Sequence, residues 1–206
     1  KAALKLSDYV VTEAGFGADL GAEKFMDIKC RKANLKPNCV VIVATIKALK
    51  MHGGVEKEDL KKENVEALKK GFVNLERHIN NVKKFGVETI VAINHFITDT
   101  DNEIKVLKEY CDSIGVQVSK CTHWSDGGEG TKDLAKKVVE ISENSNPDNF
   151  KFLYDENDAL WNKVEKIAKN IYKASKITAD ENVKEQIKIF EKNATNYHRK
   201  VFFFFN

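Results

Sequence analysis

The residues best suited to chemistry lie in three short stretches of the sequence, and the first is a glycine turn. Gly15, Phe16 and Gly17 follow an apolar segment, residues 9–12, that is predicted to be a short buried strand. Glycines let the backbone approach a ligand closely, and a turn from a strand into a helix exposes free amides. The same residues also suit a plain connection with a helix cap, with the helix beginning near Leu20. The turn therefore predicts either one wall of a ligand pocket or a tight connection between a strand and a helix.

The other two stretches place aromatic side chains directly after predicted strands. Asn94 and Phe96 follow the apolar segment 87–93, and Trp124 follows a shorter segment, residues 116–119. Open α/β sheets bind ligands beyond the carboxyl ends of their strands. A flat heteroaromatic ring held between two aromatic side chains gains about a few kcal/mol from stacking and burial. We expect the two rings to face each other across one crevice, unless both are ordinary core or loop anchors.

Polar residues near this crevice leave several roles open. His95 and His123 are candidates for an acid or a base, or are loop histidines, and the five histidines of the chain show no metal spacing. Residues 127–130 offer free amides to an anion, or cap the next helix. The run 98–101 suits either a cation or a helix cap. Asn94 ends its strand, as does the asparagine that recognises the nucleotide base in P-loop nucleotide-binding folds. This similarity is an analogy between folds only. No catalytic residue is assigned.

The order of the predicted elements indicates an α/β protein with a mostly parallel sheet flanked by helices. A continuous apolar run at residues 39–44 predicts a further buried strand. Helices are expected over residues 21–34, 45–51, 58–85 (with a break near Gly71), 102–113 and 131–143. Strands that alternate with helices form right-handed βαβ units. Two more helices, over residues 158–174 and 179–193, have no strand between them and predict a helical annex.

These elements predict three regions along the chain. Residues 1–145 would form the α/β portion of a catalytic domain, residues 146–193 the C-terminal helical annex, and residues 194–206 a divergent tail that ends in four phenylalanines. A chain of 206 residues can form one domain with a small annex.

Composition narrows the class of protein. Hydrophobic residues make up 42% and charged residues 32%, and 34 basic residues balance 31 acidic ones to a net charge of +3. This balance argues against a nucleic-acid surface. The four cysteines include no C-x-x-C pair, which indicates free thiols in a reducing compartment. We find neither a signal peptide nor a run of 18 apolar residues, so we expect a cytoplasmic protein without a membrane partner.

Four longer segments closely resemble the formate–tetrahydrofolate ligase family, also called formyltetrahydrofolate synthetases. They are YVVTEAGFGADLGAEKF at residues 9–25, VATIKALKMHGG at residues 43–54, AINHFITDT at residues 92–100 and WSDGGEG at residues 124–130. They stand in the family's order, and the resemblance runs from the first residues to about Asn193. Members of this family are well over twice as long, so the sequence resembles a middle piece of one.

The resemblance implies a function, a fold and a set of ligands. The function is the ATP-dependent joining of formate to tetrahydrofolate, which gives 10-formyltetrahydrofolate through formyl phosphate. The fold would be P-loop-NTPase-like, and the ligands would be formate, ATP with Mg²⁺, tetrahydrofolate and a possible monovalent cation. The full-length protein would be a homotetramer. By resemblance, Phe96 and Trp124 hold the pterin ring, and the pocket wall includes Gly15, Phe16, Gly17 and Asn94.

Several features depart from the family pattern. Lys47 stands where the family usually has arginine. Lysine keeps the positive charge but lacks the planar guanidinium group that makes two-point contacts. Ile97 replaces a common proline and predicts a less rigid loop after Phe96. The phosphate-binding motif G-x-x-x-x-G-K-[ST] is not among these residues, and the resemblance implies that it lies upstream. We therefore expect the chain to form the folate-binding side of the pocket and to be inactive alone. Two alternatives remain: a nucleotide-binding regulatory protein and a catalytically silent interaction protein.

Overall fold

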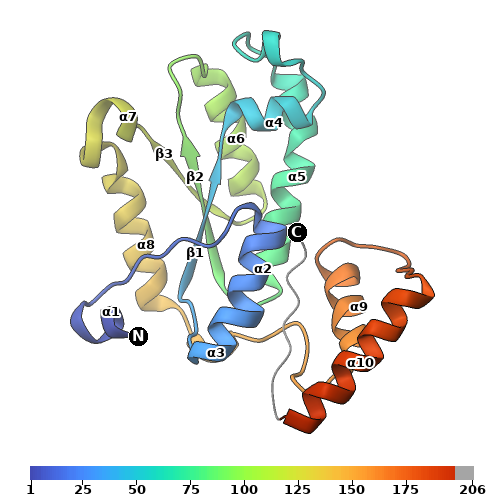
Figure 1. The fold of residues 1–206 in the computed structure, drawn as a ribbon. Coiled ribbons are helices and arrows are strands. Elements are labelled where there is room, and N and C mark those ends of the chain that lie inside the picture. Colours follow the sequence, from blue (N-terminus) through green and yellow to red (C-terminus); the bar gives the residue numbers. More distant parts are fainter. Residues whose placement is uncertain (198–206) are drawn as a thin grey trace. The chain divides into compact units, whose positions relative to one another are not determined.

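The computed structural model describes residues 1–197, and they divide into two compact units (Figure 1). One unit is Lys36–Lys151, and the other joins residues 1–35 to the segment that begins at Phe152. The predicted region boundaries at 145/146 and 193/194 stay predictions. The end of the predicted tail, residues 198–206, lies outside the described residues.

The unit Lys36–Lys151 is built on a sheet of three parallel strands. In order across the sheet they are β1 (Cys39–Ala44), β2 (Glu88–Asn94) and β3 (Gln117–Cys121). The register sets Ala44 beside Ile93, and Asn94 beside Cys121. The prediction of an α/β fold with a parallel sheet is confirmed, although the third strand begins and ends slightly later than expected.

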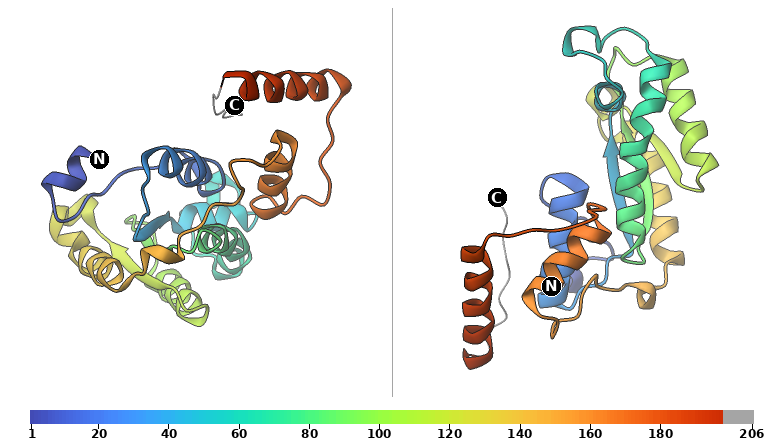
Figure 2. Two further views of the ribbon diagram at one scale, coloured as in Figure 1. Left: turned by 90° about the horizontal axis from the view of Figure 1, so that it is seen from below. Right: turned by 90° about the vertical axis from the view of Figure 1, so that its right-hand side faces the viewer.

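Helices flank this sheet on both sides. They are α4 (Ile46–His52), α5 (Val65–Lys83), α6 (Asp101–Ser113), α7 (His123–Asp126) and α8 (Lys132–Asn144), with short 3₁₀ turns at Lys57–Asp59, Gly127–Thr131 and Pro147–Asn149. Helices α5 and α6 pack together beside the sheet, and α8 lies on its other side (Figure 2). Fully buried side chains of α5 and β2, such as Leu68, Ile79, Ile90 and Ile93, form the core.

Helix α5 corrects two details of the helix expected over residues 58–85. It begins only after Asn64, whose side-chain oxygen accepts a hydrogen bond from the Ala67 N–H at 2.9 Å and so caps the helix. The helix also runs unbroken through Gly71. A methyl group there would place its Cβ 2.0 Å from the Leu49 carbonyl oxygen, so glycine lets α4 and α5 cross closely instead of breaking the helix.

A fully buried ion pair joins α4 to α6. The Lys50 ammonium lies 2.9 Å from the Glu103 carboxylate and also donates to the Lys62 carbonyl at 2.8 Å. Burial alone would raise the pKa of Glu103, but hydrogen bonds from the Asn64 N–H, the Lys50 ammonium and the Thr100 N–H together hold that pKa below its usual range. The pair therefore fixes the start of α6, which directly follows the Phe96 loop.

The second unit is helical where its structure is regular. Its elements are α1 (Ala2–Leu6), α2 (Ala22–Lys24), α3 (Arg31–Ala33), α9 (Leu160–Asn170) and α10 (Glu181–Tyr197), with π-helical turns at Gly17–Gly21 and Phe25–Cys30. The expected C-terminal helices are present as α9 and α10, while a separate helical annex stays a prediction. The first long helical stretch begins at Gly17 rather than near Leu20.

The predicted buried strand at residues 9–12 is wrong. The structure gives these residues no strand, and Val11 is 90% exposed. A strand needs a neighbour to satisfy its backbone groups. Within the described chain the sheet consists of β1, β2 and β3 alone. An apolar pattern such as that of residues 9–12 carries no information about such a neighbour.

The cysteines behave as the sequence predicts, because all four are free thiols. Burial raises the pKa of Cys30, Cys39 and Cys111 to about 11, so these thiols stay protonated at neutral pH and are poor nucleophiles. Among the helices of the described residues, none combines the length and apolar character that crossing a membrane requires.

Candidate functional site

The carboxyl ends of the three strands lie along one edge of the sheet, and each leads to a residue singled out above. Lys47 follows β1, Phe96 follows β2 and Trp124 follows β3. The His95 N–H donates to the Cys121 carbonyl at 3.1 Å, so the loops after β2 and β3 start side by side. Phe96 is half-buried and Trp124 is 76% exposed. Whether the two rings hold a ligand between them stays a prediction.

The loop that carries Phe96 is held by a reciprocal pair of hydrogen bonds. The Phe96 N–H donates to Asp99 Oδ2 at 2.9 Å, and the Asp99 N–H donates to the Phe96 carbonyl at 2.9 Å. Ile97 points outward and is 99% exposed. Asp99 therefore restrains the Phe96 backbone, while the expectation that the loop is less rigid without the proline stays a prediction.

The same loop buries oxygen atoms that have no hydrogen-bond partner. They are Asn94 Oδ1, Thr98 Oγ1 and Asp99 Oδ1. Buried polar atoms are nearly always paired, and unpaired ones often mark functional sites. The helix cap that follows is Thr100, whose side chain accepts from the Glu103 N–H at 3.2 Å. In the described part of the chain, no three His, Cys, Asp or Glu side chains gather as metal ligands.

The Trp124 loop is a short helix, α7, closed by its own hydrogen bonds. The Thr122 hydroxyl donates to Asp126 Oδ2 at 2.6 Å, and the Thr122 N–H donates to the Gly130 carbonyl at 3.0 Å. A Cβ on Gly130 would lie 2.6 Å from Thr122, so glycine is required there. The glycines at 127–130 form a 3₁₀ turn that leads into α8, while the space around Gly128 is open.

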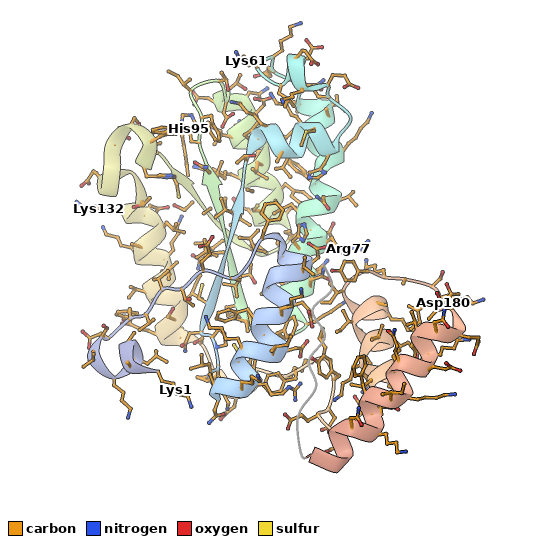
Figure 3. All side chains as sticks on the ribbon, viewed as in Figure 1. Lys1, Lys61, Arg77, His95, Lys132 and Asp180 are labelled. Atoms are coloured by element: carbon orange, nitrogen blue, oxygen red, sulfur yellow. The ribbon has the colours of Figure 1, made fainter. Side chains whose placement is uncertain are left out.

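The two candidate acid–base histidines differ in their surroundings. His95, labelled in Figure 3, directly follows β2. It is half-buried, whereas His123 is exposed. Hydrogen bonds from Thr122 and Ser125 lower the pKa of Asp126, and the nearby His95 lowers it further. The Asp126 carboxylate thus interacts electrostatically with His95.

The glycine turn belongs to the other unit and has a well-defined geometry of its own. The Phe16 side chain is fully exposed, and Gly17 has a φ of 82°, which favours glycine. The Gly21 N–H donates to the Phe16 carbonyl at 3.2 Å. A Cβ on Gly21 would lie 1.7 Å from the Gly15 carbonyl oxygen. Conformation explains Gly17 and steric constraint explains Gly21 without any ligand, whereas a Cβ on Gly15 would make only an ordinary contact, 3.6 Å from the Gly21 Cα.

A buried carboxyl pair in this unit was not singled out from the sequence. Glu23 is 5% exposed and Asp27 is fully buried, one helical turn apart. Burial, followed by the charge of Asp27, raises the pKa of Glu23 to about 8. Asp27 Oδ1 accepts from the Leu153 N–H at 3.0 Å, and Arg31 donates to the Tyr154 carbonyl at 2.7 Å. The i, i+4 spacing was the available signal, but it does not say which helix face is buried.

A parallel three-stranded sheet flanked by helices defines the α/β class of proteins, in which ligands commonly bind beyond the carboxyl ends of the strands. The comparisons with known proteins are more specific. A family model described as "Formate--tetrahydrofolate ligase" matches residues 1–200, and the chain belongs to this family.

Curated relatives that match the chain carry the same name. The "Formate--tetrahydrofolate ligase" of Pelagibacter ubique (strain HTCC1062) is 66% identical over 191 residues, which cover 93% of this chain and 34% of that protein. Those of Granulibacter bethesdensis and Sinorhizobium fredii are 59% and 56% identical, over 93% and 92% of this chain and 33% and 34% of theirs. The chain thus spans about a third of the length of these relatives.

Proposed function

We propose that this chain supplies the folate-binding side of an ATP-dependent ligase that joins formate to tetrahydrofolate. The observation that carries the proposal is the position of Phe96 and Trp124. They follow adjacent parallel strands, at the edge where such sheets bind ligands, in a chain of this family. The restraint that Asp99 places on the Phe96 backbone supports it, because a stacking ring must be held in place before the ligand arrives.

The proposed reaction has two steps. Formate first attacks the terminal phosphate of ATP, giving formyl phosphate and ADP. The N10 amine of tetrahydrofolate then attacks the formyl carbon, phosphate leaves, N10 loses a proton, and 10-formyltetrahydrofolate results. We assign the first step, with ATP and Mg²⁺, mainly to the remainder of a longer polypeptide, because the phosphate-binding motif is not among these 206 residues. We also propose that the full-length ligase is homo-oligomeric and cytoplasmic and that it uses a monovalent cation.

In this proposal the chain's own residues orient the substrate. Phe96 and Trp124 stack on the pterin ring, and Asn94 forms part of the wall, where its buried oxygen lacks a partner. The turn with Gly15, Phe16 and Gly17 stays a proposed ligand-contacting element on the strength of the family resemblance. Of the two histidines, we propose the half-buried His95 at the end of β2 as the acceptor of the proton that N10 releases.

Fluorescence quenching and calorimetry with tetrahydrofolate test the stacking directly. Trp161 is first changed to phenylalanine, so that Trp124 becomes the only tryptophan. We expect tetrahydrofolate to quench the remaining signal. Because Trp124→Ala removes the reporter, its affinity is measured by calorimetry, and we expect a loss of about 5- to 150-fold, which corresponds to about 1–3 kcal/mol for one stacking partner.

Phe96→Ala should weaken binding to a similar extent, while Phe25→Ala provides the matched control. Phe25 is a half-buried ring of the helical unit. Unchanged affinity in both the Trp124→Ala and the Phe96→Ala variants would contradict the proposal, as would an equal loss in the control.

A further inference from the structure

The structure places a cation directly over the ring of Phe96. The Lys47 ammonium lies 4.5 Å from the centre of that ring. Lys47 is the second residue of α4, whose start is capped by the Thr45 side chain accepting from the Ala48 N–H at 3.1 Å. Within the described residues, Lys47 forms no ion pair with a carboxylate, so the aromatic ring is the partner that the structure gives its charge.

The strand order determines from which side this cation comes. Lys47 follows β1, Phe96 follows the central strand β2, and Trp124 follows β3. Helices α4 and α7 accordingly stand on opposite sides of the end of β2 (Figure 1). The ammonium therefore reaches the Phe96 ring from the β1 side. In the proposed pocket the flat ligand stacks on the face of the Phe96 ring that the ammonium does not cover.

We infer that Lys47 is a positioning residue that holds the Phe96 ring from behind and selects an electron-rich, reduced pterin over its fully oxidised form. An ammonium over one face of an aromatic ring is attracted by the ring's electrons and polarises them toward itself. The opposite face then becomes poorer in electrons and stacks better on an electron-rich ring. A tetrahydropterin is richer in electrons than an oxidised pterin. The inference rests on the proposed function, because it concerns the same pocket.

The contact itself is tested in the ligand-free 206-residue chain by NMR of the lysine side chains. A ring current above an aromatic face shifts nearby protons upfield, so we expect an upfield shift of the Lys47 ε-methylene protons. Phe96→Leu should remove that shift. Phe25→Leu should leave the Lys47 shift in place. Phe25 lies in the other unit, where its ring makes a similar contact, at 4.6 Å, with Lys29. No shift in the native chain, or a shift that survives Phe96→Leu, would overturn the inference.

Selectivity is tested by comparing affinities for tetrahydrofolate and for oxidised folate. We expect Lys47→Met to weaken tetrahydrofolate binding by about two- to fivefold, the range typical of an exposed cation–π contact, and to weaken folate binding less. Lys47→Arg should restore the preference, since arginine keeps the charge. Lys29→Met, the matched control, should change neither affinity.

The outcomes separate this inference from the proposed function. If Lys47→Met binds tetrahydrofolate as tightly as the native chain, or more tightly, the cation does not support the stacking face and the inference fails. If the native chain binds neither compound, the proposed function fails and the selectivity with it. The NMR shift of Lys47 in the free chain then still decides whether the ammonium holds the ring.

Discussion

Glu23 and Asp27 share one buried site, and their protonation couples the stability of the helical unit to pH. Burial raises the pKa of both carboxyl groups, that of Glu23 from 4.5 to about 8 and that of Asp27 from 3.8 to about 6. Glu23 Oε1 and Asp27 Oδ2 have no hydrogen-bond donor in the structure. A proton between the two groups removes the repulsion of two buried carboxylates.

The sign of the pH effect follows from these shifts. The folded chain keeps a proton on Glu23 that the unfolded chain releases above pH 4.5. The contribution of Glu23 to stability is therefore fully present below that pH and is lost as the pH rises toward about 8. We expect Glu23→Gln, whose amide donates to Asp27 at every pH, to flatten this dependence. At pH 8 it should be more stable than the native chain by about 1–3 kcal/mol.

Urea unfolding of both chains between pH 4.5 and 8.5 measures this difference. Glu13→Gln removes an exposed carboxylate from the same unit and should leave the pH dependence unchanged. If the free energy of unfolding varied with pH in the same way for the native chain and for Glu23→Gln, the folded chain would hold no extra proton on this pair.

Helices α4 and α5 depend on a glycine where their backbones cross. A Cβ at Gly71 would lie 2.0 Å from the Leu49 carbonyl oxygen, which is too close for any atom. We expect Gly71→Ala to lower the free energy of unfolding by about 1–3 kcal/mol, even though alanine favours helix by about 1 kcal/mol over glycine. Because α4 carries Lys47, the same change should also reduce the upfield shift of its ε-methylene protons.

Lys70→Ala serves as the control, since Lys70 is the exposed neighbour of Gly71 on the same helix. Chemical denaturation should place it within about 0.5 kcal/mol of the native chain. A Gly71→Ala chain as stable as this control would mean that the crossing adapts at no cost.

At the scale of the whole molecule, strand β1 presents an apolar edge. In the described chain β1 pairs on one side alone, with β2, and Val43 is 67% exposed. Unpaired, apolar edge strands promote association between copies. We expect the 206-residue chain to self-associate as its concentration rises, and Val43→Lys to shift it toward monomer, as measured by sedimentation velocity.

Val73 offers a matched control, because it is 69% exposed but lies on helix α5. Val73→Lys adds the same charge without touching the sheet edge. If both substitutions reduce association equally, net charge and not the β1 edge governs it.

Local features of this protein follow from the sequence alone, because they depend on neighbours along the chain. The apolar runs at β1 and β2 identified parallel strands, and the periodic apolar residues of α5 identified its inner face. The expectation that both strands are buried holds for β2 but is wrong for β1, where Val41 and Val43 are exposed. Thr100 lies in the run expected to cap α6, and it does so. The four family segments placed Phe96 and Trp124 after their strands. Spacing and side-chain chemistry suffice for such inferences.

Only the tertiary structure decided the features that depend on contacts between distant segments. Residues 9–12 have the composition of a strand but no partner in the described sheet, and composition cannot supply one. The spacing of Glu23 and Asp27 places them on one helix face, but only packing buries that face. The contact between Lys47 and Phe96 requires β1 and β2 to be neighbours, which joins residues 49 positions apart in the chain. Burial and strand order are properties of the assembled fold, and they determine where each charge lies.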